Sequence, residues 1–305
     1  MTQNTQSNVR TTDRPMTIGM VGLGRMGAGL SGRLKAAGHK VVGYDRNSEI
    51  SEVGSVAEMV SKLPAPRVVW LMVPSGDITQ STMEAVASEL AQGDVVIDGG
   101  NSYVKDTVRR GKELRERGIH FVDAGTSGGI WGEENGFCLM VGGERDAVAI
   151  VEPLFLTLAP QDGYAHVGGP GAGHFTKMVH NGIEYGMLQA FAEGFDLLHS
   201  ATEYGLDLHQ IAGIWNHGSV VRSWLLELAE DAFAKDARLD SLKGYVDDSG
   251  EGRWTVLEAV ERGVNAGVLA QSLFARFTSR EDNAFSMRVI AALRNEFGGH
   301  PVKSV

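Results

Sequence analysis

The stretch TIGMVGLGRMG, residues 17–27, joins a short apolar run to three glycines spaced as G-x-G-x-x-G. A helical pattern continues from it to Ala37, and the next apolar run ends in Asp45, eighteen residues past Gly27. In a strand–turn–helix unit, glycines at these spacings allow a tight turn and bring a pyrophosphate to the N-terminus of the helix. We therefore predict a dinucleotide-binding turn formed by Gly22, Leu23, Gly24, Arg25, Met26 and Gly27.

Short apolar runs alternate with helix-length segments through the first half of the chain. Crossover helices are expected at residues 26–37, 77–90 and 104–117, and strands at 17–22, 40–45, 67–73, 94–100, 119–125 and 138–143. This alternation predicts an α/β fold, in which a doubly wound parallel Rossmann sheet carries helices on both faces.

The pattern changes after VGGPGAGH, residues 167–174, where strand-like runs end and a helical period dominates. Further helices are expected at residues 188–199, 220–234, 256–262, 269–277 and 285–297. We therefore predict a disordered tail at residues 1–15, a dinucleotide-binding Rossmann domain at 16–168 and a smaller all-α domain at 169–305.

Composition and charge limit the partners and the compartment. The net charge of the 305 residues is −10, which argues against nucleic acid or an anionic membrane as a partner. Cys138 is the only cysteine, so no intrachain disulfide can form, and a reducing, cytoplasmic compartment is expected. The first fifteen residues lack the apolar run of a secretory signal, and no stretch approaches the roughly 20 apolar residues of a membrane span.

The residues after the second apolar run bear on the choice of cofactor. The carboxylate of Asp45 suits a ribose with free hydroxyls and repels a 2′-phosphate, which favours NAD. Arg46 acts in the opposite direction, because a guanidinium can hold that phosphate. NAD is therefore the predicted cofactor, and NADP stays open. Asn47, just past this run, and Val73, at the end of the third run, are also predicted cofactor residues.

Two further glycine-rich segments follow predicted strands, DGGNSYVKDT at 98–107 and DAGTSGGIWGEENG at 123–136. Loops beyond the carboxyl ends of strands form the ligand crevice of an open α/β sheet. We therefore expect the crevice to contain Asn101, Ser127, Gly128 and Gly129, with Asn101 near both substrate and cofactor. The alternative for Asn101 and Ser127 is a turn residue that bonds its own backbone.

Two other chemistries are disfavoured by the motifs. Residues 125–129 spell the G-x-S-x-G of a hydrolase nucleophile elbow, but the two glycines after Ser127 make a poor helix start. The histidines and the single cysteine show no metal-ligand spacing, so no catalytic metal is expected.

The segment KMVHNGIEY, residues 177–185, has an unusual helical stripe. Its offsets i, i+3, i+4, i+7 and i+8, which amphipathic helices normally fill with apolar residues, carry Lys177, His180, Asn181, Glu184 and Tyr185. We interpret the stripe as the lining of a polar cavity close to the domain boundary. The alternative is a solvated outer face, although such faces usually carry several alternating charges. A lysine in such a cavity can act as a general base when burial lowers its pKa.

Together these segments resemble the decarboxylating 6-phosphogluconate dehydrogenases, within the β-hydroxyacid dehydrogenase superfamily. The resemblance extends from Met16 almost to the end of the chain and rests on GAGHFTKMVHNGIEY, GNSYVKDT, TSGGIWGEENG, GEGRWT and ALRNEFGGH. The length is similar to that of the shorter bacterial, NAD-preferring form. The resemblance implies oxidative decarboxylation of 6-phosphogluconate to ribulose 5-phosphate and CO2 with reduction of NAD or NADP, as in the pentose phosphate pathway and gluconate utilisation.

The resemblance also implies roles for individual residues. Lys177 would be the general base and later acid, and Glu184 the acid that protonates the carbanionic carbon. The implied substrate binders are Asn101, Ser127, Gly128, Gly129, His180, Asn181, Tyr185 and, for the phosphate, Arg276. Arg294 and His300 would reach the neighbouring subunit's site, which implies a homodimer or homotetramer. From sequence alone these last two and Arg276 would be ordinary surface residues.

The chain departs from the longer enzymes of this family at two places. Ser249 stands where they have a lysine, so one phosphate or substrate contact is missing or replaced. Asp45-Arg46-Asn47 stands where they have Asn-Arg-Thr, which supports NAD. Two alternative functions stay open: another β-hydroxyacid dehydrogenase or imine reductase of the same fold, and a dinucleotide-binding sensor without turnover.

Overall fold

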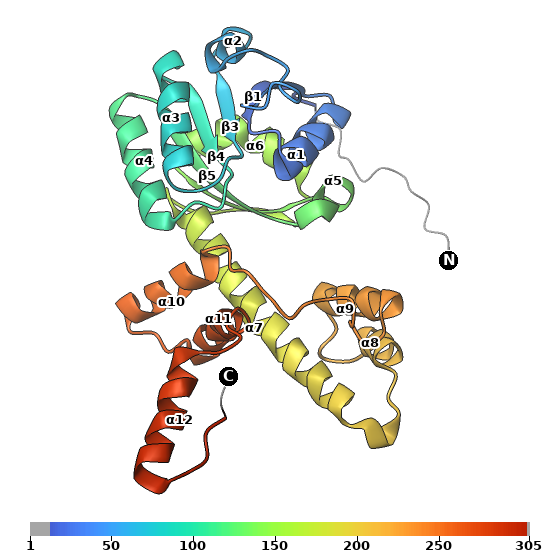
Figure 1. Cartoon of the computed structure of the whole chain (residues 1–305). Coiled ribbons are helices and arrows are strands. Elements are labelled where there is room, and N and C mark those ends of the chain that lie inside the picture. The colour runs from blue at the N-terminus through green and yellow to red at the C-terminus, as the bar shows by residue number, and fades with distance from the viewer. Residues whose placement is uncertain (1–12, 304–305) are drawn as a thin grey trace. The chain divides into compact units, whose positions relative to one another are not determined.

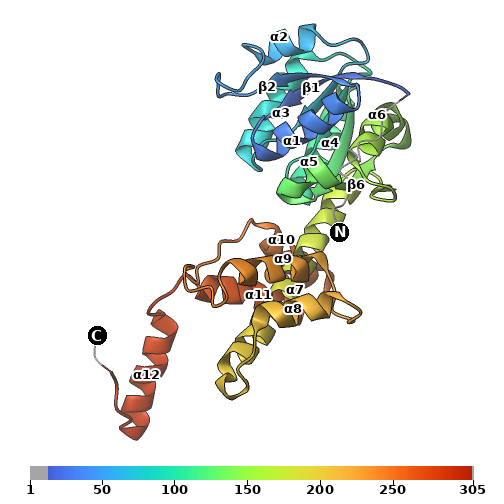
Figure 2. The same ribbon diagram turned by 90° about the vertical axis from the view of Figure 1, so that its right-hand side faces the viewer.

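The computed structural model describes residues 13–303, so residues 1–12 of the predicted tail lie outside the described part. The chain divides into two compact units, Met1–His180 and Asn181–Val305. The described residues of the first unit form a seven-stranded sheet in the order β2-β1-β3-β4-β5-β6-β7 (Figures 1 and 2). The strands are β1 (Thr17–Val21), β2 (Lys40–Tyr44), β3 (Val68–Leu71), β4 (Val95–Asp98), β5 (His120–Ser127), β6 (Cys138–Gly143) and β7 (Tyr164–Gly168).

The strand directions differ from the all-parallel prediction at one place. Strands β1 to β5 pair in parallel, β6 runs antiparallel to β5, and β7 is parallel to β6. The connection from β5 to β6, residues 128–137, is shorter than the roughly dozen residues that a parallel crossover needs. Strand β7 was not among the predicted strands, and it lies at the edge of the sheet with alternate residues exposed.

Helices cover both faces of this sheet, as the doubly wound pattern predicts (Figure 1). The helical elements of the unit are α1 (Arg25–Ala36), α2 (Val56–Ser61), α3 (Asp77–Glu89), α4 (Val104–Glu116), η1 (Gly129–Trp131), α5 (Gly132–Asn135) and α6 (Arg145–Leu158). Successive residues of β3 enter different apolar clusters: Trp70 packs in the cluster that includes α1 and α6 side chains, and Leu71 in the one that includes α2, α3 and α4 side chains. Because successive side chains of a strand point to opposite faces, a strand buried on both faces contributes to one apolar core on each face of the sheet.

The second unit is helical in its described residues. Its elements are η2 (Thr202–Tyr204), α8 (Leu208–Asn216), α9 (Trp224–Lys235), α10 (Glu251–Arg262), α11 (Gly267–Thr278) and α12 (Phe285–Gly298). Asp207 and Ser223 cap α8 and α9, since their side chains accept hydrogen bonds from Gln210 N–H and Leu226 N–H. A small apolar core joins these two helices to the end of α7 through Phe195, Leu208, Ala212, Leu226 and Phe233.

Helix α7 (Ala172–Ser200) belongs to both units. It begins four residues after β7 ends at Gly168, and the units divide inside it, between His180 and Asn181. The domain limits predicted from the sequence therefore remain a prediction. Within residues 13–303 no helix combines the length and the apolar character needed to cross a membrane.

Candidate active site

Two glycines of the turn after β1 lie where a side chain would collide with backbone, and the third faces open space. Gly22 has a φ of +93°, and a Cβ there would collide with the carbonyl oxygen of Met72. A Cβ on Gly27 would collide with the carbonyl oxygen of Gly22, so the first turn of α1 passes close to the turn. Gly24, the N-cap of α1, has open space where its Cβ would lie. An anionic group can therefore approach the backbone N–H groups at this helix N-terminus.

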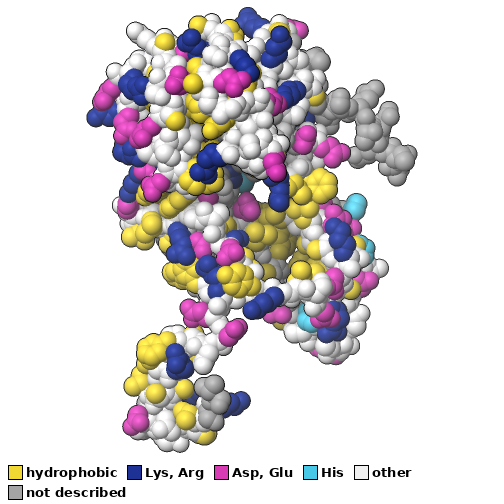
Figure 3. All heavy atoms as spheres, turned by 45° about the horizontal axis from the view of Figure 1, so that its top comes forward, with side chains coloured by type: hydrophobic (Ala, Val, Ile, Leu, Met, Phe, Trp, Pro, Cys, Tyr) yellow, Lys and Arg dark blue, Asp and Glu magenta, His cyan; other side chains and the backbone are white. Residues whose placement is uncertain are grey.

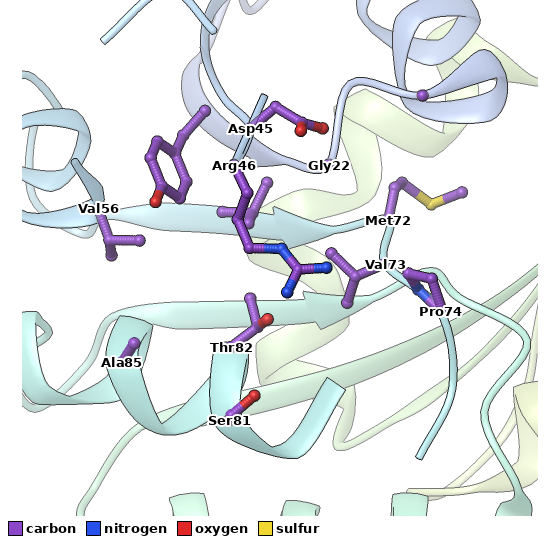
Figure 4. Close-up of a pocket in the computed structure, with 13 residues that line it drawn as sticks. Gly22, Asp45, Arg46, Val56, Met72, Val73, Pro74, Ser81, Thr82 and Ala85 are labelled. Carbon is purple, nitrogen blue, oxygen red and sulfur yellow. The ribbon is translucent and has the colours of Figure 1, made fainter. Parts of the chain in front are cut away.

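A pocket of about 370 Å³ lies beside this turn (Figure 4). Predicted cofactor residues in its lining are Gly22, Gly24, Asp45, Arg46 and Val73. Other lining residues come from the β3–α3 segment and from two helices, and the sequence reasoning missed them: Val56, Pro74, Ser81, Thr82 and Ala85. Because β1 lies between β2 and β3 and pairs in parallel with both, the carboxyl ends of these three strands lie side by side.

The carboxylate of Asp45 also holds the turn in place. Its Oδ2 accepts a hydrogen bond from Leu23 N–H at 2.8 Å, and its Oδ1 accepts one from Asn47 N–H at 2.8 Å. Figure 4 shows Arg46 extending across the pocket between Val73 and Thr82. A pocket with glycine backbone at one end and a fixed carboxylate beside it fits a dinucleotide with an unmodified ribose.

The first turns of α7 are pressed against the sheet of the same unit. The buried carboxylate of Asp123, in β5, accepts hydrogen bonds from Gly171 N–H at 2.7 Å and His174 N–H at 2.8 Å, which caps the helix from a neighbouring strand. His174 Nδ1 lies 2.8 Å from Thr107 Oγ1 and so links α7 to α4. The stem of Lys177 passes directly over Gly125, where an added Cβ would lie 2.5 Å from Lys177 Cβ.

Three residues of the polar stripe of α7 are more buried than two apolar residues beside it, Ile183 and Met187. Lys177, Asn181 and Tyr185 are 6%, 7% and 5% exposed, whereas Ile183 and Met187 are 51% and 39% exposed. Solvation of a polar face would give the opposite distribution. His180 and Glu184 are half-buried, and His180 Nε2 lies 3.4 Å from Ser127 Oγ at the end of β5.

Tyr185 is the centre of a polar cluster inside the helical unit. Its hydroxyl accepts a hydrogen bond from Ser249 N–H at 3.0 Å, and Arg276 Cζ lies 3.4 Å from the centroid of its ring. The Arg276 guanidinium also donates to the carbonyl oxygen of Asp247 at 3.0 Å. A Cβ on Gly252 would meet the Tyr185 ring at 2.5 Å, so α10 approaches the ring through a glycine.

Two more arginines lie beside this cluster. The buried carboxylate of Asp248 accepts hydrogen bonds from Arg253 at 2.6 Å and from Arg280 at 3.0 Å. These hydrogen bonds, the one from Arg253 first, hold the pKa of Asp248 below its usual range. The segment that carries Ser249 in place of a lysine is therefore surrounded by guanidinium groups.

The other predicted residues lie in the loops after β4 and β5 and in or just after α12. Asn101, in the loop after β4, is exposed, and Gly128 and Gly129 follow β5 with φ of +136° and +54°. Ser127 is followed by a 3₁₀ turn and the four-residue helix α5, so the strand-to-helix elbow of a hydrolase does not form. Arg294, on α12, is exposed, and its carbonyl accepts a hydrogen bond from His300 N–H at 3.4 Å.

Comparison with known proteins connects the two units to one family. Residues 17–168 match the family model of the NAD binding domain of 6-phosphogluconate dehydrogenase, and residues 173–300 match that of the 6-phosphogluconate dehydrogenase C-terminal domain. The Bacillus subtilis protein YqeC is 47% identical over 294 residues, which are 93% of this chain and 98% of that protein. The chain belongs to the 6-phosphogluconate dehydrogenase family. The family resemblance drawn from the motifs is thereby confirmed.

Other members of the 6-phosphogluconate dehydrogenase family are similar in sequence or structure. The NAD(+)-dependent, decarboxylating 6-phosphogluconate dehydrogenase of Haloferax volcanii is 43% identical, over 94% of this chain and 98% of that one. The Plasmodium falciparum 6-phosphogluconate dehydrogenase matches with a TM-score of 0.80 and 27% identity, over 95% of this chain and 66% of that one. Outside the family, Mycobacterium tuberculosis 3-hydroxyisobutyrate dehydrogenase shares the fold, with a TM-score of 0.71 and 24% identity over 92% of this chain and all of that one.

Proposed function

We propose that this protein oxidises and decarboxylates 6-phosphogluconate to ribulose 5-phosphate and CO2, in the pentose phosphate pathway and gluconate utilisation. The observation that carries the proposal is the buried polar stripe of α7, in a chain whose relatives include a decarboxylating 6-phosphogluconate dehydrogenase. A lysine, an amide and a phenol held out of water on one helix provide a base and hydrogen-bonding groups for a polyhydroxylated acid.

NAD is the proposed cofactor, and when bound it supplies the acceptor for the hydride of the substrate. The pocket beside Gly22 and Gly24 would hold it, with the carboxylate of Asp45 toward the ribose hydroxyls. Arg25, Met26 and Gly27, in the first turn of α1, would complete the phosphate-binding turn. Arg46 lines the same pocket, and its guanidinium would also accommodate NADP.

Lys177 is the proposed base for the C3 hydroxyl of the substrate. Lys177 is 6% exposed, and as a free amine it would take the hydroxyl proton. The resulting ketone is β to the C1 carboxylate, and the electrons of the C1–C2 bond pass into an enediolate as CO2 leaves. The Lys177 ammonium then stabilises the enediolate oxygen. Glu184, seven residues along α7, protonates the former C2, which becomes C1 of ribulose 5-phosphate.

The remaining residues would bind the substrate. We assign the phosphate to Arg276 and Tyr185, whose contact already sets the direction of the guanidinium. Arg253 and Arg280 lie beside them and would add positive charge where the longer enzymes have the lysine that Ser249 replaces. The sugar acid would contact Asn101, Ser127, Gly128, Gly129, His180 and Asn181.

A homodimer or homotetramer is proposed from the surface of the helical unit, where Figure 3 shows hydrophobic side chains. On α12, Phe285, Met287 and Leu293 are 71%, 59% and 58% exposed, although soluble monomers rarely expose contiguous apolar patches. We infer that a second copy covers α12 and that Arg294 and His300 complete that copy's site. The cytoplasm is the proposed compartment.

Subunit mixing tests this assignment. A hybrid of Lys177→Met and Arg294→Ala subunits contains one site with both native residues if Arg294 acts in the neighbouring subunit. Mixed and reassembled subunits should then recover activity that neither parent has. If the mixture shows no more activity than the two parents, Arg294 does not act across the interface.

Steady-state kinetics tests the proposed reaction. We expect NADH and CO2 to form in equal amounts from 6-phosphogluconate, with a higher kcat/KM for NAD than for NADP. Reactions with 3-hydroxyisobutyrate and with a cyclic imine plus NADH are the controls for other enzymes of this fold. Oxidation without CO2 release, or preference for either control substrate, would reject the proposal.

A further inference from the structure

A buried carboxylate at the carboxyl end of β4 holds both neighbours of Asn101. Asp98 is 1% exposed. Its Oδ1 accepts a hydrogen bond from Gly100 N–H at 3.2 Å, and its Oδ2 accepts one from Ser102 Oγ at 2.8 Å. Asn101 lies between these two residues, so its backbone position depends on the carboxylate although its own side chain is exposed.

The partner of Asp98 is a buried arginine that also holds a second loop. Arg110, on α4, is 1% exposed, and its Nη1 lies 3.9 Å from Asp98 Oδ2. Its Nη2 donates to the carbonyl oxygen of Gly76 at 3.0 Å, and its Nε donates to Gln80 Oε1 at 2.9 Å. Gly76 is the N-cap of α3 and follows Val73 and Pro74, which line the dinucleotide pocket.

The two loops are also in direct contact. A Cβ on Gly100 would lie 2.8 Å from the carbonyl oxygen of Val73, so the Asn101 loop packs against the backbone of the pocket-lining loop. A Cβ on Gly99 would collide with Trp70 Nε1, so this residue too must be glycine for the loop to pack there. The Asp98–Arg110 pair therefore joins two loops that already touch at Gly100.

We propose that Asp98 and Arg110 are positioning residues that hold Asn101 in register with the dinucleotide pocket. The proposal deepens the proposed function, since it assumes that Asn101 faces the substrate and that the pocket binds NAD. The charges of the pair offset each other away from water, while the hydrogen bonds of Arg110 are made by Nε to Gln80 and by Nη2 to Gly76. A shift of Asp98 would move Asn101 through Gly100 and Ser102, and a shift of Arg110 would move the loop that contains Val73.

A residue just before β4 offers a matched control. Asp94, which directly precedes the first residue of β4, is also 1% exposed and also pairs with an arginine. It accepts hydrogen bonds from Arg67 N–H at 2.7 Å and Ala91 N–H at 2.8 Å, at the edge of the sheet opposite the ligand loops. Asp94→Asn and Asp98→Asn therefore make the same chemical change just before β4 and at its carboxyl end, and only the second touches the ligand loops.

The experiment measures melting temperature, NADH affinity by fluorescence titration, and kcat and KM with 6-phosphogluconate. We expect both variants to lower the melting temperature. Asp98→Asn should lower kcat/KM on the order of 10- to 100-fold and weaken NADH binding, as expected for a lost hydrogen bond to a charged group. Asp94→Asn should leave both within about twofold of the wild type. Equal effects of the two variants, or none from Asp98→Asn, would overturn the proposal.

A second variant applies if Asp98→Asn does not fold. Ser102→Ala removes only the hydroxyl that donates to Asp98 Oδ2, and should lower kcat/KM with 6-phosphogluconate about tenfold while NADH affinity stays unchanged. Wild-type kinetics would overturn the role of the Asp98 contact. A wild type inactive on 6-phosphogluconate would refute the proposed function. NADH titration needs no turnover, so the NADH affinities of Asp94→Asn and Asp98→Asn would still test the positioning role.

Discussion

A methyl group at Gly125 should displace the proposed catalytic base. In Gly125→Ala the new Cβ would lie 2.5 Å from Lys177 Cβ and 2.9 Å from the carbonyl oxygen of Gly173. Carbon atoms in contact are normally about 3.5–4.0 Å apart, so α7 or its lysine stem must move by about 1.0–1.5 Å. A misplacement of ~1 Å can cost about 100-fold in rate, and overpacking costs about 1–3 kcal/mol of stability.

The assay is NADH formation from 6-phosphogluconate, with NADH affinity and thermal unfolding measured in parallel. We expect kcat to fall about 100-fold and the melting temperature by about 2–12 °C, while NADH affinity changes little. Gly194→Ala is the control, because Gly194 lies in the same helix with open space around its missing Cβ. The free energy of unfolding of that variant should rise by about 0.8–1.0 kcal/mol, and its kcat should stay unchanged. If Gly125→Ala is destabilised but keeps its kcat within about threefold, Lys177 is not the base.

Four other changes test the remaining assignments. Lys177→Met should keep NADH affinity and lose about 10²- to 10⁴-fold in kcat, and substantial residual turnover would exclude its role as base. Glu184→Gln should lower kcat severely with a smaller change in KM, whereas a change in KM alone would make it a binding residue. Arg276→Met should raise KM for 6-phosphogluconate about 10- to 100-fold with KM for NAD unchanged, and an unchanged KM for 6-phosphogluconate would place the phosphate elsewhere. Burial lowers the pKa of His39 below 6.5. Just below pH 6.5 the unfolded chain therefore binds a proton at this histidine that the folded chain does not. The free energy of unfolding that is present above pH 6.5 is then partly lost as the pH falls below 6.5. Urea unfolding at about pH 7.5 and about pH 5.5 should show this loss in the wild type and less of it in His39→Gln; equal losses would assign it to other groups.

Local patterns predicted the elements that depend on near neighbours in the chain. The glycines of residues 22–27 need their spacing because turn, helix start and close approach lie within six consecutive residues. The polar stripe of α7 is visible for the same reason, since a helix of known period decides which residues share a face. The strands before Gly128 were found from their apolar runs, but the reversed direction of β6 follows from the length of its connection.

The contacts across the sheet depended on the order of its strands, which no local pattern contains. Asp45 follows β2, and Thr82 and Ala85 lie on α3, which follows β3. They line one pocket because only β1 stands between β2 and β3 in the sheet. A pattern of apolar residues does not specify which strands are neighbours. In the sequence Asp98 and Asp123 stand in apolar runs and Arg110 stands in a charged segment, so neither the Asp98–Arg110 pair nor the Asp123 cap of α7 is visible there. Folding places each of these buried groups beside a partner that is distant along the chain. A buried carboxylate or guanidinium is stable only where hydrogen-bond or charge partners compensate for the lost water, so only the tertiary structure reveals these contacts.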